Sequence, residues 1–316
     1  MNDFFNPLNF FSDKVEESAS AREVLREKLG LVPFLNQRQI ITVNESIHCE
    51  LYHHSDDAPV LIFLPGIGTY CELYAELLAG IANQGFNVIG MDLRGHGYSS
   101  GTRGDYRVEQ IIDDVSAVID HLSVQYQGSV GVYGYSIGGL LAVAAAERDV
   151  RILSVLCGTL LVTEIAPDLV HQFGWSWTWS SALFFPHLKI PMKTFIDYEE
   201  LLKGHPAAAE ISKDPRIVYD YPLGTLASLF THTSGSMKKY FNFKAAIIHG
   251  EHDEVLPLSY SKQVIESMTH PFELVELKGE GHMVPWDNPK LLIKEVGQWF
   301  KKTLEHKSVT VTSSFC

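Results

Sequence analysis

The chain has few basic residues for its length. Its 316 residues include 25 Lys and Arg against 38 Asp and Glu, so the formal net charge at pH 7 is −13. Nucleic-acid phosphates and anionic lipid headgroups both attract clustered Lys and Arg. The charge balance therefore argues against a nucleic-acid-binding surface and gives no reason to expect affinity for anionic lipids.

Cysteines and long apolar runs are also scarce. Cys49, Cys71, Cys157 and Cys316 show neither metal-ligand nor redox-pair spacing, which predicts free thiols in a reducing compartment. No run approaches the roughly 18 apolar residues of a membrane-spanning helix, and the N-terminus lacks a basic-then-apolar signal. We therefore expect a soluble, cytoplasmic protein without stable membrane insertion.

Motifs for metals and nucleotide cofactors are missing too. His53 and His54 are adjacent on a predicted strand, where neighbouring side chains point to opposite faces and do not chelate together. The glycines near Gly95 do not form the Gly-x-Gly-x-x-Gly pattern that follows a strand and opens a helix. We expect no cofactor and no metal.

What the chain does contain is a serine between glycines at a strand-to-helix boundary. The segment Gly134-Tyr135-Ser136-Ile137-Gly138-Gly139 follows a short apolar run and precedes an Ala-rich helical one. The same short pattern arises by chance in Gly-rich loops, but a flanking strand and helix are typical of a nucleophile elbow. Ser136 is the predicted nucleophile.

A serine hydroxyl is a weak nucleophile, so it needs a base. The predicted strand 272–277 is followed by a glycine-flanked loop that contains His282, and this histidine is the predicted base. His96 also lies in a glycine-rich loop, but it precedes the serine in the chain. We expect His96 to be structural.

The base in turn needs a carboxylate that orients it. The predicted strand 245–249 leads into Gly250-Glu251-His252-Asp253-Glu254, where Asp253 is the predicted acid and Glu254 and Glu251 remain alternatives. The chain order serine, acid, histidine is that of the α/β-hydrolase fold.

Two backbone N–H groups are needed to stabilise the oxyanion. The Ile137 N–H follows the nucleophile at the start of a helix, which is the usual place for one donor. The loop Pro65-Gly66-Ile67-Gly68 follows a strand at 60–64, and Ile67 is the predicted second donor. The alternative is an ordinary Gly-rich turn into the next helix.

From Ile40 to Lys302, the sequence resembles the α/β-hydrolases of the monoacylglycerol lipase and lysophospholipase-like group, which often carry the serine aminopeptidase (S33) label. The segments that carry the resemblance are Leu64-Pro65-Gly66, Met91-Asp92-Leu93-Arg94-Gly95-His96-Gly97-Tyr98-Ser99, the elbow at Ser136, Gly250-Glu251-His252-Asp253 and Gly281-His282. Pro65 stands where the family usually has His. This change keeps the backbone donor but removes a side chain that the family often packs under the site.

Apolar and helical stretches alternate as a doubly wound sheet requires, which predicts an α/β-hydrolase fold with a mostly parallel eight-stranded sheet, helices on both faces and an inserted cap. The predicted strands span 39–43, 47–53, 60–64, 87–91, 129–133, 152–156, 245–249 and 272–277, and the first two should form a hairpin. The predicted helices span 70–83, 108–125, 137–147, 258–268 and 289–302.

The expected domain organisation is a single hydrolase core with one insertion. Residues 1–37 form an N-terminal helical extension, with a helix over 12–29, and residues 305–316 form a flexible tail. The core comprises residues 38–161 and 242–304, and residues 162–241, which show no clear strand, form a cap or lid.

The cap composition bears on the substrate. Its aromatic residues include Trp175, Trp179 and Phe184, which we predict to line the substrate pocket, although such side chains also serve to pack a cap onto a core. An apolar cap suits an acyl chain. The chain is therefore expected to bind a small-molecule ester or lipid.

The predicted function is a serine esterase that cleaves a monoacylglycerol, a lysophospholipid or a medium-chain ester through an acyl-enzyme. One alternative is an aminopeptidase or amidase on the same fold, which would need cap carboxylates such as Glu164, Asp168, Glu199 or Glu200 to bind an amine. The other is a non-catalytic binding protein, which has no need to keep all three triad positions filled.

Overall fold

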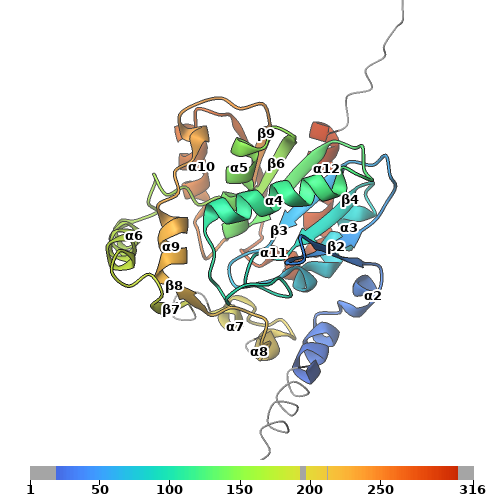
Figure 1. The fold of residues 1–316 in the computed structure, drawn as a ribbon, viewed down its shortest axis with the longest axis horizontal. Helices are drawn as coiled ribbons and strands as arrows, with labels where there is room; N and C mark the ends of the chain where they lie inside the picture. Colours follow the sequence, from blue (N-terminus) through green and yellow to red (C-terminus); the bar gives the residue numbers. More distant parts are fainter. Residues whose placement is uncertain (1–18, 193–196, 212, 305–316) are drawn as a thin grey trace, which may run out of the picture.

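The computed structural model describes residues 19–192, 197–211 and 213–304. Eight strands form one sheet in the order β1-β2-β4-β3-β5-β6-β9-β10 (Figure 1). Strand β2 is antiparallel to both β1 and β4, and every other neighbouring pair is parallel. The strands are β1 (Gln39–Val43), β2 (Ile47–Tyr52), β3 (Val60–Leu64), β4 (Asn87–Met91), β5 (Val130–Tyr135), β6 (Ile152–Gly158), β9 (Lys244–Gly250) and β10 (Phe272–Leu277).

The predicted mostly parallel, eight-stranded sheet is confirmed, including the hairpin of β1 and β2. Strands β1, β3, β4 and β10 have the predicted bounds. Strands β5 and β6 each extend two residues beyond the predicted end, so β5 runs up to the serine turn itself. The strand that leads to Ser136 is therefore paired along its whole length.

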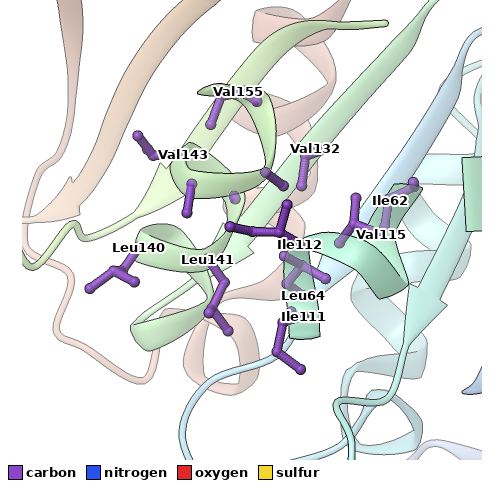
Figure 2. Close-up of a cluster of buried hydrophobic side chains, with 14 of the residues drawn as sticks. Ile62, Leu64, Ile111, Ile112, Val115, Val132, Leu140, Leu141, Val143 and Val155 are labelled. Atoms are coloured by element: carbon purple, nitrogen blue, oxygen red, sulfur yellow. The ribbon is translucent and has the colours of Figure 1, made fainter. Parts of the chain in front are cut away.

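Helices cover both faces of this sheet, because the side chains of each buried strand alternate between two apolar cores. In β3, Ile62 and Leu64 belong to the core that contains α4 and α5, and part of this core is drawn in Figure 2. Leu61 and Phe63 belong to the other core, which contains α3 and α12. The helices are α2 (Val32–Leu35), α3 (Ala75–Ala82), α4 (Val108–Leu122), α5 (Ile137–Arg148), α10 (Leu258–Ser267), α11 (Val284–Asp287) and α12 (Pro289–Leu304).

The helical predictions differ from the structure at their ends: α5 ends one residue after its predicted end, α10 ends one residue before it, and α12 ends two residues after it. The predicted helix 70–83 is a 3₁₀ turn at Cys71–Tyr74 followed by α3. Helix α4 ends at Leu122, three residues before the predicted end. Among the described residues, no helix combines the length and apolar composition needed to cross a membrane.

The segment between β6 and β9 lies beside the sheet and not within it (Figure 1). It contains α6 (Leu169–Ala182), β7 (Lys189–Pro191), α7 (Tyr198–Leu201), α8 (Ala208–Ile211), β8 (Asp220–Pro222) and α9 (Leu223–Phe230). The sequence shows no clear strand here, but β7 and β8 pair as a small antiparallel sheet. Three-residue strands are too short to show an alternating pattern in the sequence.

The N-terminal extension is helical over residues 19–28, and its chain turns at Gly30, whose φ is +67°. The predicted start of this helix at residue 12 lies outside the described residues, as does the predicted flexible tail at 305–316. The helix is held by Arg26, whose guanidinium makes two hydrogen bonds of 2.6 Å to Glu72. Arg38 donates a third bond to Glu72, at 3.0 Å.

Glu72 is almost completely buried between these two arginines. Burial by itself raises the pKa of a carboxyl, but the hydrogen bonds and charges of Arg26 and Arg38 hold the pKa of Glu72 below its ordinary value. The carboxylate therefore stays ionised and connects the extension to the turn that follows the Ile67 loop.

We expect Glu72→Gln to destabilise the protein by about 3 kcal/mol, because breaking a buried ion pair leaves uncompensated charge. Urea unfolding followed by tryptophan fluorescence measures this change. Glu210→Gln is the matched control, since Glu210 pairs with Lys28 of the same helix at the surface, at 3.0 Å. Equal midpoints for Glu72→Gln and wild type would contradict the importance of the buried pair.

Candidate active site

Ser136 lies at the turn between β5 and α5, in a backbone conformation that residues other than glycine seldom adopt. Its φ is 55° and its ψ is −123°. Its N–H donates a 2.7 Å hydrogen bond to the Gly158 carbonyl, and its side chain is partly exposed. Such strain costs about 1–3 kcal/mol and persists only where the surrounding structure enforces it.

The glycines on either side of Ser136 allow the turn to be this tight. A Cβ atom on Gly134 would lie 2.0 Å from the Gly138 carbonyl oxygen, and one on Gly138 would lie 2.3 Å from the Leu64 carbonyl oxygen. Both distances are far below van der Waals contact. Strand β5, helix α5 and the end of β3 therefore meet at a point where no larger residue fits.

His282 and Asp253 come together after β10 and β9. His282 Nδ1 lies 2.7 Å from Asp253 Oδ2, and both residues are more than nine-tenths buried. A carboxylate only accepts hydrogen bonds, so Nδ1 carries the proton of the neutral ring and Nε2 is left as the basic nitrogen. This is the tautomer that a general base requires.

Two backbone groups fix the other carboxylate oxygen. Asp253 Oδ1 accepts hydrogen bonds of 2.8 Å from the N–H groups of Val255 and Leu256. Burial acts to raise the pKa of Asp253, but the hydrogen bond and charge of His282, together with the Leu256 N–H, hold it below the ordinary value. Asp253 is therefore ionised at neutral pH.

The alternative acids have other partners. Glu254 Oε2 accepts from the His282 backbone N–H at 2.9 Å, and Glu251 Oε2 accepts from the Gly279 N–H at 3.0 Å. Both carboxylates hold the backbone of the histidine loop. Asp253 is the one that bonds to the His282 ring.

Tyr135 connects the serine turn to the histidine loop, a role for which the sequence holds no signal. Its hydroxyl donates to the His282 carbonyl, and its ring centroid lies 5.4 Å from that of His282. Because Tyr135 immediately precedes Ser136, the His282 loop packs directly against the serine turn. The tyrosine is buried, with 4% of its surface exposed.

His249 is a second buried histidine near the acid that sequence reasoning does not single out. Its Nε2 lies 2.9 Å from the Leu256 carbonyl oxygen and 3.6 Å from Asp253 Oδ2, and its Nδ1 lies 2.7 Å from Ser261 Oγ. Burial lowers the pKa of His249. The neutral ring supports the loop in which Asp253 lies.

Two N–H groups of the loop after β3 donate to tyrosine hydroxyls. The Gly66 N–H donates to Tyr74 Oη at 3.4 Å, and the Gly68 N–H donates to Tyr221 Oη at 2.7 Å. Among the described residues, the Ile67 N–H makes no hydrogen bond. Buried backbone donors are nearly always paired, so a free N–H beside a serine turn is available to a substrate oxygen.

The same loop lies against Ser136. A Cβ atom on Gly66 would lie 3.4 Å from Ser136 Cβ. The Ile137 N–H belongs to the first residue of α5, where no carbonyl of the same helix is in reach. The two predicted oxyanion donors therefore sit on the two segments that contact Ser136.

His96 is engaged on both ring nitrogens and fully buried. Its Nδ1 lies 2.9 Å from the Arg94 carbonyl oxygen, and its Nε2 is hydrogen-bonded to Tyr221 Oη. Burial lowers the pKa of His96 to about 4, so the ring is neutral at pH 7. Its contacts are structural.

The structure places the three predicted pocket residues on the segment between β6 and β9. Trp175 stacks on Phe230 of α9, with ring centroids 5.8 Å apart, while Trp179 and Phe184 are 52% and 77% exposed. None of the three lines the small cavity beside Asp253. Contact of these side chains with substrate stays a prediction.

This sheet, with a serine at the sharp turn after β5, defines an α/β-hydrolase. The family model described as serine aminopeptidase, S33 (Hydrolase_4) matches residues 55–288. The chain belongs to that family, in agreement with the resemblance drawn from its motifs.

Individual relatives agree with this class. The bifunctional esterase/perhydrolase of Acinetobacter calcoaceticus is 24% identical over 76% of this chain and 91% of its own length. The 3-oxoadipate enol-lactonase 2 of Acinetobacter baylyi is 38% identical over 29% of this chain, and the match spans only 34% of that relative. The crystal structure of a monoacylglycerol lipase from Paleococcus ferrophilus has the same fold, with a TM-score of 0.66 and 20% identity over 81% of this chain and 98% of the lipase.

We expect Asp253→Asn to lower kcat by about a thousandfold or more, because the amide no longer favours the Nδ1–H tautomer of His282. Steady-state ester hydrolysis measures the loss. Glu254→Gln is the matched control and should cost less than about tenfold, since it changes only a backbone contact. A larger loss in the control than in Asp253→Asn would make Glu254 the acid.

His96 should make the folded state sensitive to mild acid. Its folded pKa of about 4 lies below the unfolded value of 6.5, so the unfolded state takes up the proton first as the pH falls. Above pH 6.5, the lowered pKa of His96 costs the folded state nothing. As the pH falls from 6.5 to 4, the free energy of unfolding decreases by about 3 kcal/mol.

Urea unfolding at pH 7.5 and pH 4.5 tests this expectation. The difference in unfolding free energy between the two pH values should be smaller in His96→Gln than in wild type, whereas the exposed-site variant His121→Gln should match wild type. The pKa values of His249 and His270 are also lowered, so only the difference between proteins is assigned to His96. An unchanged pH dependence in His96→Gln would contradict the assignment.

Proposed function

We propose that the protein hydrolyses carboxylic esters through an acyl-enzyme on Ser136. The observation that carries the proposal is the 2.7 Å contact between His282 Nδ1 and Asp253 Oδ2, in a loop that packs against the strained serine turn. The esterase and lactonase among the relatives support ester chemistry.

In the first half of the reaction, Ser136 Oγ bonds to the ester carbonyl carbon while His282 Nε2 takes the hydroxyl proton. The carbonyl π electrons move onto the oxygen, which accepts hydrogen bonds from the Ile67 and Ile137 N–H groups. One such donor commonly lowers the barrier by roughly 3–4 kcal/mol. When the carbonyl re-forms, the ester C–O bond breaks and the imidazolium returns its proton to the leaving alcohol.

The second half repeats these steps with water. His282 removes a proton from water, the resulting hydroxide attacks the acyl carbon, and the Ser136 Oγ–acyl bond breaks as Oγ regains the proton. Throughout, the ionised Asp253 stabilises the imidazolium that forms on His282.

Residues 162–241 are proposed as a cap that contacts the acyl chain. The stretch from 169 to 188 contains no Asp, Glu, Lys or Arg. It nevertheless exposes large apolar side chains, namely Leu169, Val170, Phe173, Trp177, Trp179, Leu183, Phe184, Phe185 and Leu188. A patch of this kind on a surface segment is typical of a binding surface for apolar groups. A monoacylglycerol, a lysophospholipid or a medium-chain ester would present such a group.

An amide substrate with a free amine is less well supported. Candidate carboxylates in this segment already have partners in the structure: Glu164 accepts from the Ser234 N–H, Asp168 accepts from the His171 N–H, and Glu200 pairs with Lys203. A substrate amine would compete with these partners. The family description names aminopeptidases, so amides belong in the assay.

A cytoplasmic location is proposed from the thiols. Cys49, Cys71 and Cys157 are buried and unpaired, and burial raises the pKa of each, which keeps the unreactive thiol form. Cys316 lies outside the described residues. Unpaired thiols persist in reducing compartments.

The test is hydrolysis of p-nitrophenyl esters from acetate to palmitate, with aminoacyl arylamides in parallel. We expect kcat/KM to peak at medium or long acyl chains, because an apolar cap gains free energy with each buried methylene. Ser136→Ala should remove this activity, whereas Ser123→Ala, a surface substitution after α4, should retain it.

Each other result has a distinct meaning. Faster cleavage of arylamides than of esters would replace the esterase by an aminopeptidase. Equal rates for all chain lengths would remove the acyl-binding role of the cap. No activity in wild type, together with no labelling of Ser136 by a fluorophosphonate, would leave a non-catalytic binding protein.

A further inference from the structure

The loop that carries the Ile67 N–H is held by the inserted segment. The Tyr198 hydroxyl donates to the Ile67 carbonyl, and the Gly68 N–H donates to Tyr221 Oη at 2.7 Å. These two groups are the two ends of one peptide bond. Tyr198 begins α7 and Tyr221 lies in β8, so two separate elements of the insertion hold a single peptide plane.

A third hydrogen bond restricts the backbone of the same loop at Gly68. The Val218 N–H donates to the Gly68 carbonyl at 2.9 Å. Gly68 has a φ of +72°, and a Cβ atom there would lie 2.5 Å from the Val218 carbonyl oxygen. The insertion therefore covers the loop so closely that only glycine fits.

Tyr221 is itself oriented by His96. The Arg94 carbonyl can only accept, so the proton of the neutral His96 ring is on Nδ1, and Nε2 accepts from the Tyr221 hydroxyl. The oxygen of Tyr221 is then free to accept from Gly68. A continuous hydrogen-bonded chain runs from the Arg94 carbonyl to the Ile67–Gly68 peptide.

We infer that Tyr198 and Tyr221 are positioning residues for the oxyanion site. By holding both ends of the Ile67–Gly68 peptide, they set the orientation of the adjoining Ile67 N–H, the backbone N–H in this loop without a partner among the described residues. The inference rests on the proposed function, in which that N–H stabilises the oxyanion. It gives the insertion a part in catalysis besides acyl binding.

A purely structural role predicts something different. If the two hydroxyls only dock the insertion onto the core, their loss should lower the melting temperature or raise KM without changing the chemical step. If they align a donor that acts in the transition state, their loss should lower kcat and leave KM nearly unchanged. The split between kcat and KM therefore separates the two roles.

The experiment compares Tyr198→Phe and Tyr221→Phe with Tyr106→Phe in the full chain. Tyr106 is a fully buried tyrosine whose ring lies 5.6 Å from that of His96, and its hydroxyl has no hydrogen-bond partner among the described residues. We expect Tyr198→Phe and Tyr221→Phe each to lower kcat on the order of tenfold, with KM within about twofold of wild type. Tyr106→Phe should retain wild-type kinetics, because it loses no bond.

A transition-state analogue provides a second readout. An alkyl trifluoromethyl ketone forms a hemiketal with the serine, and its oxyanion occupies the same position as that of the reaction. Its Ki should rise by the factor by which kcat/KM falls in Tyr198→Phe and Tyr221→Phe. The double variant should lose less than the product of the single losses, because freeing either end already releases the peptide.

The experiment separates failure of the positioning role from failure of the proposed esterase function. Rates are normalised to the folded fraction measured by circular dichroism, and if Tyr221→Phe does not fold, Tyr198→Phe decides. Unchanged kcat, or a rise in KM alone, would overturn the positioning role while the esterase proposal stands. Failure of a fluorophosphonate to label Ser136 in wild type would overturn the proposed function and the positioning role together.

Discussion

The strained turn at Ser136 is the constraint on which the site depends. Ser136 holds its φ of 55° because β5 is paired on both sides up to the turn and α5 begins directly after it. That arrangement requires Gly134 and Gly138 to approach neighbouring backbone within distances that no Cβ permits. The strain of about 1–3 kcal/mol is therefore offset by sheet pairing and helix packing.

The rest of the site is assembled around this turn by buried hydrogen bonds. Tyr135 bonds to the His282 carbonyl, Glu254 bonds to the His282 N–H, and Asp253 bonds to the ring. The histidine is thus fixed at three points, by partners from both β5 and the loop after β9. In the proposed mechanism His282 is the general base, and fixing it in this way reduces the conformational entropy that is lost when the base is aligned for the reaction.

Features of the fold and the site that depend on neighbouring residues can be predicted from the sequence, whereas contacts between residues far apart in the chain cannot. Strands such as β3 and β4 and the serine turn follow local patterns of apolar residues and glycines, so their bounds were predictable. The short pair β7 and β8 has no local pattern. Tyr198 and Tyr221 also escape prediction, because they bond to loop groups 131 and 153 residues away in the chain. Neither tyrosine belongs to a motif that marks such a partner.

The insertion thus has two faces with different chemistry. Its outer helix α6 exposes apolar side chains, while α7 and β8 direct tyrosine hydroxyls onto the loop after β3. In many enzymes a cap varies to suit the substrate while the catalytic core stays rigid. Here the hydrogen bonds of Tyr198 and Tyr221 limit that independence, since any movement of α7 or β8 moves the Ile67–Gly68 peptide as well. In the proposed function, residues 162–241 form the cap and the Ile67 N–H stabilises the oxyanion. A change in that cap that alters substrate fit would then also act on the geometry of the oxyanion donor, so that binding and chemistry are coupled through one peptide bond.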